Sequence, residues 1–193
     1  MKPKDLLAPW QNTRSVKSSP MKKRKQGRPA NRPAPVKARK HKASSVQTTI
    51  VDFQHGVHLA LENRLLEAIQ AFKHVVDSNP VGDLADDALA NLGLCYMRIN
   101  SFNNAIDCFT RVVTEYPDAK IAVAARAQEV GRTAAKALLG RMRCRLAQGD
   151  REQAKADLER LTAFSDSYVI DAQGKRRSFH ELGREAIACV PPS

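Results

Sequence analysis

The residues best suited to bind a metal lie on the first helical stretch of the sequence. His55, His58 and Glu62 are spaced so that they can share one face of a helix. Zinc catalysis needs a further ligand and supporting hydrogen bonds, and the HExxH spacing of zinc proteases does not occur. A packed or surface histidine is the better interpretation of these residues. We therefore expect no metal site here.

The four cysteines are too far apart in the sequence for a zinc ribbon or a disulfide framework. Cys95, Cys108, Cys144 and Cys189 include no CxxC pair. Cys95 and Cys108 fall on predicted packed helices, where a thiol fills space like a small apolar side chain. Free thiols are expected. A glycine-rich phosphate loop and a nucleophile elbow are also missing. We therefore expect no enzyme, no catalytic residue and no cofactor.

The positive charge of the sequence is confined to its first 46 residues. Residues 1–46 contain nine Lys and five Arg against one acidic residue, Asp5, a net charge of +13. The rest of the chain has 18 basic and 19 acidic residues. The tail is also rich in proline and poor in apolar residues after Trp10, so it cannot bury enough surface to offset the entropy of ordering. We predict a disordered tail and a nearly neutral folded region.

Two dense basic clusters in the tail indicate binding to a polyanion, by release of counterions. Gly27-Arg28-Pro29 resembles the core of an AT-hook, although Gln26 stands where that motif has Arg. DNA, RNA and an acidic protein remain alternative ligands, and a merely solubilising tail remains another interpretation. The predicted polyanion-binding residues are Lys22, Lys23, Arg24, Lys25, Arg28, Lys37, Arg39, Lys40 and Lys42.

From Thr48 onward the apolar residues recur with helical spacing, and aromatic residues make up only 5% of the chain. Three capping patterns support helix starts, at Thr49 with Asp52, at Asp150 with Gln153 and at Ser178 with Glu181. An all-α fold is therefore predicted. The expected helices are 49–62, 65–77, 84–99, 103–115, 119–147 with a bend at Gly131, 150–164 and one from 178, with a loop over 165–177.

Residues 86–119 contain a pair of predicted helices with a characteristic pattern of residue sizes. Its members are Leu89, Leu92, Gly93 and Tyr96 on the first helix, and Ala105, Phe109, Val112 and the closing Pro117 on the second. Gly93 and Ala105 are small where two helices must cross closely, and Tyr96 and Phe109 fill the space between hairpins. This pattern resembles the tetratricopeptide repeat (TPR), a helical hairpin of about 34 residues.

Two further copies of the pattern are visible on either side. The earlier copy comprises Gly56, Leu59, Ala68, Phe72, Val75 and Pro80. The later copy comprises Leu138, Ala154, Leu158 and Leu161, with Met142, Arg145 and Asp166 in place of the glycine, the aromatic residue and the proline. The resemblance implies an α-solenoid of three hairpins with a C-terminal capping helix. The expected divisions are 1–46 (tail), 47–168 (repeat domain) and 169–193 (loop, capping helix and end).

TPR proteins bind peptides or helices in a concave groove. Carried over to this sequence, the groove consists of Phe53, Val57, Ala90, Asn91, Leu94, Met97, Lys136, Leu139 and Arg143. This row is largely apolar, which favours an amphipathic helix or an extended apolar peptide as partner. The carboxylate clamp of chaperone-binding TPR domains is missing, because Phe53, Val57 and Gly140 occupy three of its positions. The alternative is that the tail or the last helix fills the groove.

The sequence YPDAKIAVAARA after the second copy resembles bacterial TPR proteins of cell-envelope assembly. Neither a signal-peptide core nor an apolar run of about 20 residues is found, so we expect a cytoplasmic protein, or a nuclear one if the source is eukaryotic, with no membrane contact. The sequence predicts an adaptor that holds a protein or peptide partner and contacts nucleic acid through its tail. A structural subunit of a ribonucleoprotein and a secretion-type chaperone are the alternatives.

Overall fold

Seven helices and three short strands make up the part of the chain that the computed structural model describes, residues 37–122 and 128–190, with side chains described from residue 47 on. The predicted all-α class is confirmed. The helices are α1 (Lys37–Leu61), α2 (Leu65–Ser78), α3 (Ala85–Arg98), α4 (Phe102–Glu115), α5 (Thr133–Ala147), α6 (Arg151–Leu161) and α7 (Phe179–Ala188). The strands are β1 (Glu129–Val130), β2 (Tyr168–Ile170) and β3 (Arg176–Ser178).

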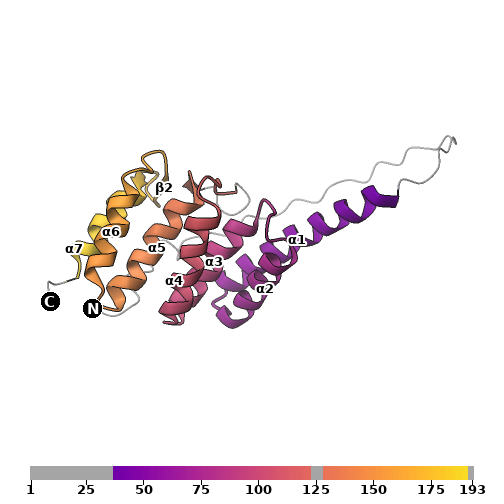
Figure 1. Ribbon diagram of the computed structural model, residues 1–193, viewed down its shortest axis with the longest axis horizontal. Coiled ribbons are helices and arrows are strands. Elements are labelled where there is room, and N and C mark those ends of the chain that lie inside the picture. The colour runs from indigo at the N-terminus through magenta and orange to yellow at the C-terminus, as the bar shows by residue number, and fades with distance from the viewer. Residues whose placement is uncertain (1–36, 123–127, 191–193) are drawn as a thin grey trace.

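The first six helices form three antiparallel hairpins, α1–α2, α3–α4 and α5–α6, stacked in a row (Figure 1). Each helix packs against the next one in the chain, and α3 also contacts α5, so that the first helices of the second and third hairpins lie side by side. Helix α7 packs against both α5 and α6. The predicted α-solenoid of three hairpins with a capping helix is therefore confirmed.

The turn inside each hairpin uses a left-handed residue at the same repeat position. Asn63 has a φ of 64°, Asn100 a φ of 59° and Gly149 a φ of 82°. Asn and Gly are the residues that adopt this conformation at least cost, and it is common just after the end of a helix. The first helix of each hairpin therefore ends at an equivalent place, which fixes where the second helix begins.

Helix α1 begins at Lys37, well before the predicted start near Thr49. No proline occurs between Pro35 and the end of α1, and Lys, Arg, Ala and Gln are good helix formers, so nothing in the sequence stops the helix there. Residues 37–46, which were assigned to the tail, thus belong to α1. The predicted disorder of residues 1–36 concerns a part of the chain outside the described residues.

The predicted continuous helix over 119–147 is wrong, because α5 begins only at Thr133. The described residues between α4 and α5 include a bridge between Lys120 and Arg132 and the strand β1. Gly131 has a φ of +117°, and a Cβ there would lie 2.5 Å from the Ser167 Cα. Only glycine fits this backbone without strain. We call residues 119–132 the inter-repeat insert.

The predicted loop over 165–177 contains two of the three strands. β2 pairs antiparallel with β3, placing Val169 opposite Arg177, and with β1, placing Val169 opposite Glu129. The resulting sheet has the order β1-β2-β3 and joins the inter-repeat insert to the segment before α7. Two of the predicted helix caps are confirmed. The Asp150 side chain accepts a hydrogen bond from the Gln153 N–H, and Ser178 forms a reciprocal capping box with Glu181.

Candidate functional site

The close helix crossing expected from the repeat pattern is present in the first two hairpins. A Cβ on Gly93 would lie 2.7 Å from the Phe109 ring, and one on Gly56 would lie 2.9 Å from the Phe72 ring. Each glycine therefore lets an aromatic side chain of the second helix reach the backbone of the first. Both rings are fully buried. The two hairpins use the same contact at the same repeat position.

The third hairpin makes this contact with the sizes exchanged. Met142 replaces the glycine and Leu158 replaces the phenylalanine, so the larger side chain now comes from the first helix. Met142 is fully buried. A small residue is still needed two residues earlier on α5, because a Cβ on Gly140 would lie 2.5 Å from the Phe109 ring. Phe109 is thus enclosed by Gly93 of its own hairpin and Gly140 of the next.

Helix α7 meets the third hairpin in the way that α5 meets the second. A Cβ on Gly183 would lie 2.8 Å from the Leu158 Cδ1 and 3.5 Å from the Met142 Cε. The contact of Gly183 with Leu158 therefore corresponds to the contact of Gly140 with Phe109. The opposite face of α7 carries exposed charged residues such as Arg184 and Glu185. α7 thus acts as the first helix of a further repeat whose outer side is polar, as expected of a terminal cap.

Stacked helical hairpins with a polar capping helix define the class of α-solenoid repeat proteins. Comparison with known families agrees, since the model of the tetratricopeptide repeat matches residues 87–119 and 136–167, which are the second and third hairpins. The second and third hairpins are therefore tetratricopeptide repeats, a repeat that in general serves as a scaffold for protein–protein interaction. A search of curated proteins found no matching relative.

The side chains predicted to line a partner groove are mostly buried. Those exposed by at most 7% are Phe53, Ala90, Asn91, Leu94, Met97, Lys136 and Leu139. Val57 and Arg143 are half-buried. Phe53 packs edge-to-face on Phe72, with ring centroids 5.8 Å apart, and so belongs to the core of the first hairpin. The nine residues therefore do not present an open surface, and their role in binding a partner stays a prediction.

Arg143 is the most unusual of these residues. Its Nε is buried and has no hydrogen-bond partner among the residues of the described ranges. Burial lowers the pKa of Arg143, partly offset by the charge of Glu185. The predicted polyanion-binding residues from Lys22 to Arg28 lie outside the described part. The remaining four, between residues 37 and 42, fall within the first turns of α1.

The histidines considered as metal ligands lie on an exposed face of α1. His58 Nε2 is 3.1 Å from Glu62 Oε1. His55 and His58 precede Leu92 and Cys95 of α3 by the 37-residue spacing of the repeat, and Leu92 and Cys95 are buried. Since no hairpin precedes α1 in the described structure, this face is polar. No group of three or more His, Cys, Asp or Glu in the described ranges is arranged to hold a metal.

All four cysteines are free thiols. Burial raises the pKa of Cys95 and of Cys108 to about 11, and that of Cys144 to about 12. Cys189, at the end of α7, is exposed. Within the described part of the chain, no helix is both long and apolar enough to cross a membrane.

A buried cluster of charged residues, which the sequence did not reveal, joins α3, α5 and the inter-repeat insert. Asp86 and Asp87 lie in the first turn of α3, Glu129 in β1 and Lys136 in the first turn of α5. Lys136 Nζ is 2.9 Å from Glu129 Oε2 and 3.2 Å from the Asn91 Oδ1. Asp87 Oδ2 accepts a 2.7 Å hydrogen bond from the Ala122 N–H. We call Asp86, Asp87, Glu129 and Lys136 the insert cluster.

The insert cluster contains three carboxyl groups and one ammonium group. Burial raises the pKa of Asp87 to about 7, which the charge of Lys136 and the Ala122 hydrogen bond only partly oppose. Burial likewise raises the pKa of Asp86. A raised carboxyl pKa means that the protonated form is favoured by the folded structure. The cluster is thus able to bind a proton near neutral pH.

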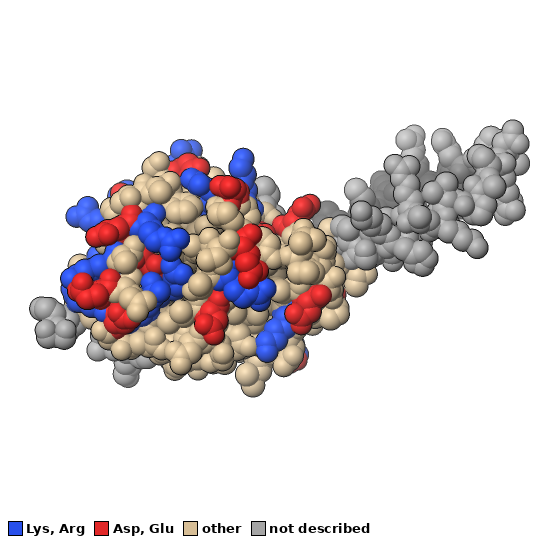
Figure 2. All heavy atoms as spheres, viewed as in Figure 1, with Lys and Arg blue, Asp and Glu red and all other residues tan. Residues whose placement is uncertain are grey.

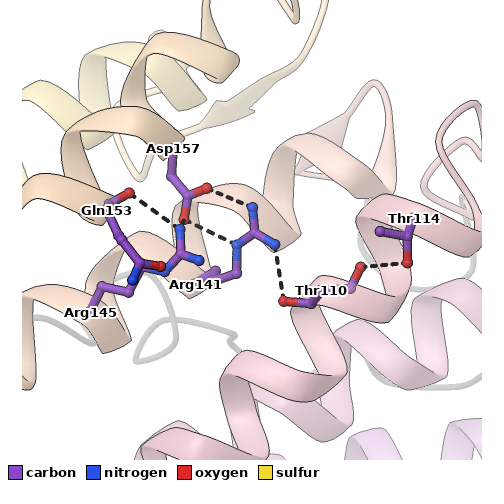
Figure 3. A network of polar contacts seen from close by, with 6 residues as sticks. All are labelled: Thr110, Thr114, Arg141, Arg145, Gln153 and Asp157. Atoms are coloured by element: carbon purple, nitrogen blue, oxygen red, sulfur yellow. Dashed lines mark hydrogen bonds and ion pairs between the residues drawn. The ribbon is translucent and has the colours of Figure 1, made fainter. Parts of the chain in front are cut away.

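A second buried ionic network connects the second and third hairpins (Figure 3). Arg141 donates to both Asp157 oxygens, at 3.1 Å from Nε and 2.6 Å from Nη2, and its Nη1 donates to the Thr110 hydroxyl at 3.0 Å. Arg145 Nη1 also donates to Asp157, at 2.6 Å. Asp157 is only 1% exposed. One carboxylate of α6 therefore holds two arginines of α5, one of which reaches α4.

The folded region is neutral overall, but its charges are unevenly placed. Residues 47–122 carry 10 acidic and 5 basic residues, whereas residues 128–190 carry 9 acidic and 12 basic ones. Figure 2 shows Lys and Arg side chains gathered over the end of the molecule formed by α5, α6 and α7. Helix α1 lies at the opposite end of the row of helices (Figure 1).

Proposed function

We propose that the protein is a non-enzymatic adaptor, whose repeats hold a protein or peptide partner and whose basic tail contacts nucleic acid or another polyanion. The observation that carries the proposal is the combination of a capped TPR solenoid with a net charge of +13 on residues 1–46. A solenoid offers an extended surface to a partner protein. A segment rich in Lys and Arg suits a ligand with regularly repeated negative charge.

The partner is an amphipathic helix or an extended apolar peptide bound along α3 and α5. Leu94, Met97 and Leu139 supply the apolar contacts, and the flexible methionine adapts to different side chains. Because these three side chains are at most 7% exposed, a partner reaches them only when this face opens. Binding should therefore be slower than diffusion-limited encounter and accompanied by a change in the exposure of α3 and α5.

The tail binds through charge rather than through base recognition. Its Lys and Arg side chains displace counterions from phosphates, so the affinity should fall steeply with salt concentration. The basic surface over α5–α7 lies at the opposite end of the row of helices from α1, so a long polyanion has a second region of positive potential available. A polyanion that spans both regions would pass along the outside of the solenoid.

The tail is tested by comparing two fourfold variants of the full-length chain that remove the same charge. The tail variant is K22Q/K23Q/R24Q/K25Q, and the matched control is K73Q/K120Q/K155Q/K175Q on exposed positions of the folded region. Affinity for a 30-nucleotide RNA and a duplex DNA of equal length is measured by fluorescence anisotropy at about 0.1 M salt. We expect at least a tenfold loss for the tail variant and a smaller loss for the control. Equal losses would refute a role for the tail.

The partner is tested by capture from the native source with the full-length protein, with and without nuclease. Cross-linking followed by mass spectrometry then locates the partner on the chain. A protein that stays bound after nuclease treatment and cross-links to α3 or α5 supports the adaptor. Capture that is lost entirely with nuclease supports the ribonucleoprotein subunit instead. Cross-links confined to the tail would reject the repeat surface as the binding face.

A further inference from the structure

Helix α5 has three arginines at alternate positions, and one of them faces away from the other two. Arg141 and Arg145 are one helical turn apart, and both bind Asp157 of α6. Arg143, two residues from each, lies on the opposite side of the helix. Lys136, seven residues before Arg143, shares that side with it. The side of α5 that faces away from α6 therefore has two cations.

The two cations differ in the partners that the fold gives them. Lys136 Nζ is 2.9 Å from Glu129 Oε2 and 3.2 Å from Asn91 Oδ1. The Arg143 Nε, in contrast, is buried and has no hydrogen-bond partner among the described residues. Lys136 is thus part of the structure of the domain, whereas Arg143 has a buried donor that lacks an acceptor.

The charge of Arg143 is not neutralised within the described part of the chain. Burial lowers the pKa of Arg143, and the neighbouring Cys144 and Glu185 oppose this only in part. The exposed Glu185 forms its ion pair with Arg177 instead. A guanidinium stays protonated in proteins, so the fold keeps a positive charge that has lost water without gaining a counter-ion. This burial costs stability, and a ligand that brings an acceptor offsets the cost.

The positions around Arg143 on the proposed partner face are apolar. Val57, Leu94 and Arg143 each directly follow the residue at the glycine position of their repeat, so they are equivalent positions on α1, α3 and α5. Leu139, one turn before Arg143, is apolar as well and 5% exposed. The row that begins with two apolar side chains on α1 and α3 therefore ends with a cation on α5.

We propose that Arg143 binds a carboxylate of the partner, so that the partner is an apolar peptide or helix with an Asp or Glu at a fixed place. The inference rests on the proposed function, because it concerns the occupant of the same face. A carboxylate bound side-on to a guanidinium accepts two parallel hydrogen bonds, from Nε and from one terminal nitrogen. Such a ligand supplies the acceptor that the buried Nε of Arg143 lacks.

A nucleic acid fits this site less well than a peptide does. Its phosphates follow one another closely along the backbone, and each needs a cation nearby. The equivalent positions beside Arg143 are Leu94 and Val57, which offer none. One desolvated guanidinium among apolar side chains instead matches one carboxylate among apolar side chains.

The place of the acidic residue in the partner follows from the spacing of the helices. Packed helices lie about 8–10 Å apart. The partner residue that contacts Leu94 is therefore separated from the one that reaches Arg143 by about six residues along a helix, or about three along an extended chain. The expected ligand has an apolar residue and an acidic residue at one of these two spacings.

Selection of peptides with the full-length protein as bait tests the inference. Random peptides displayed on phage are selected at about 0.15 M salt, where the reach of the charge on the tail is short. The strongest binder is then synthesised with a photo-cross-linker, which locates it on the chain. We expect it to cross-link to α3 or α5 and to contain an Asp or Glu at the spacing given above. Selection with Arg143→Gln should lose the preference for an acidic residue there.

A double-mutant cycle separates this ion pair from the general attraction of the basic tail. The selected peptide and a version with its acidic residue changed to the amide are titrated calorimetrically into the wild type and into Arg143→Gln. The amide should weaken binding about tenfold or more in the wild type and have little effect in Arg143→Gln. Arg160→Gln removes the same charge from an exposed position of α6 and should behave like the wild type.

The outcomes separate this inference from the proposed function. If the peptide cross-links to α3 or α5 and the amide is equally harmful in the wild type and in Arg143→Gln, the inference is overturned and the partner face stands. If the selected peptides cross-link only to the tail, the partner face is rejected and the inference falls with it.

The stability of the protein without a partner gives an independent check. Arg143→Met removes a desolvated charge that has no counter-ion, so the Tm should be unchanged or higher. Arg141→Met, two residues away, breaks the ion pair with Asp157 and should lower the Tm by about 6 °C or more. A fall of the same size for Arg143→Met would show that Arg143 stabilises the fold itself and would overturn the inference.

Discussion

Asp157→Asn is predicted to destabilise the domain because Asp157 neutralises two arginines at once. The carboxylate receives three hydrogen bonds from Arg141 and Arg145, and Arg141 in turn contacts Thr110 of the second hairpin. An amide side chain keeps the shape of the carboxylate but carries no charge. It also turns an NH2 group toward a guanidinium that can only donate hydrogen bonds. The substitution therefore leaves two positive groups without their counter-ion.

The magnitude follows from how deeply the network is buried. The side chains of Asp157, Arg141 and Arg145 are 1%, 5% and 15% exposed, so water replaces little of the lost interaction. Removing one partner of a buried ion pair costs about 3–5 kcal/mol. We expect the lower part of that range, about 3 kcal/mol, because Arg145 also donates to the Gln153 carbonyl and has some access to solvent. For a domain of this size, that corresponds to a fall in Tm of about 6–12 °C.

The assay is urea and thermal unfolding followed by circular dichroism. Asp107→Asn, which removes the same charge from an exposed position, serves as the control and should change the stability by less than about 0.5 kcal/mol. Arg141→Met combined with Asp157→Leu replaces the pair by apolar side chains and should recover part of the loss. A loss below about 1 kcal/mol for Asp157→Asn would refute the reasoning, since it would place this network among ion pairs that are effectively solvated.

Three further outcomes are expected. Gly93→Ala should lower the free energy of unfolding in urea by about 1–3 kcal/mol, because the Phe109 ring cannot withdraw from the added methyl group. Adding Phe109→Leu to the same chain should recover much of the loss. An unchanged stability of Gly93→Ala would contradict the tight crossing. Ser178→Ala should cost about 1 kcal/mol through loss of the capping box at α7, whereas an unchanged midpoint would show that α7 does not stabilise the domain. A thiol reagent at pH 8 should modify the exposed Cys189 rapidly. It should modify Cys144 only on unfolding, because burial raises the pKa of that thiol to about 12. Rapid modification of both would show that the core opens.

The hairpins could be predicted because each repeat position has a strict requirement on side-chain size. A glycine and a phenylalanine at the spacing of Gly93 and Phe109 indicate a close helix crossing, and the same pair recurs as Gly56 and Phe72. The third copy has the same close helix crossing, but its residue types differ from those of the other two copies. Met142 is large where the others are small, and the partner Leu158 is correspondingly smaller. The sum of the two volumes is preserved, which a comparison of single positions does not detect.

The inter-repeat insert could not be predicted, because its local sequence favours a helix. The run from Ala119 to Ala135 is rich in alanine and contains no proline, so propensity alone continues the helix. Tertiary contacts prevent the helix from continuing, since Asp87 accepts a hydrogen bond from the Ala122 N–H and Gly131 lies against Ser167. Strands of two or three residues are also too short to show an alternating pattern. Helix propensity is a weak preference that such contacts override.

The burial of the residues predicted to line the groove could not be predicted from the sequence. Family positions identified Asn91 and Lys136 as neighbours on the first helices, and the structure brings them together, 3.2 Å apart. Their burial depends on the charged insert that lies against them, and no spacing rule reports it. The insert cluster itself combines residues from 86 to 136, so its members cannot be linked by sequence alone.

The enclosure of Phe109 between Gly93 and Gly140 has a consequence for how such a protein can evolve. The ring requires a glycine in its own hairpin and another in the following one, so the second and third hairpins are not interchangeable modules. Placing a copy of the second hairpin after itself, or replacing the third by a copy that has a side chain at position 140, would bring a Cβ to about 2.5 Å from the ring. Gene rearrangements that lengthen this solenoid should therefore be tolerated before the second hairpin, and after it only where the added repeat has a glycine at the position of Gly140.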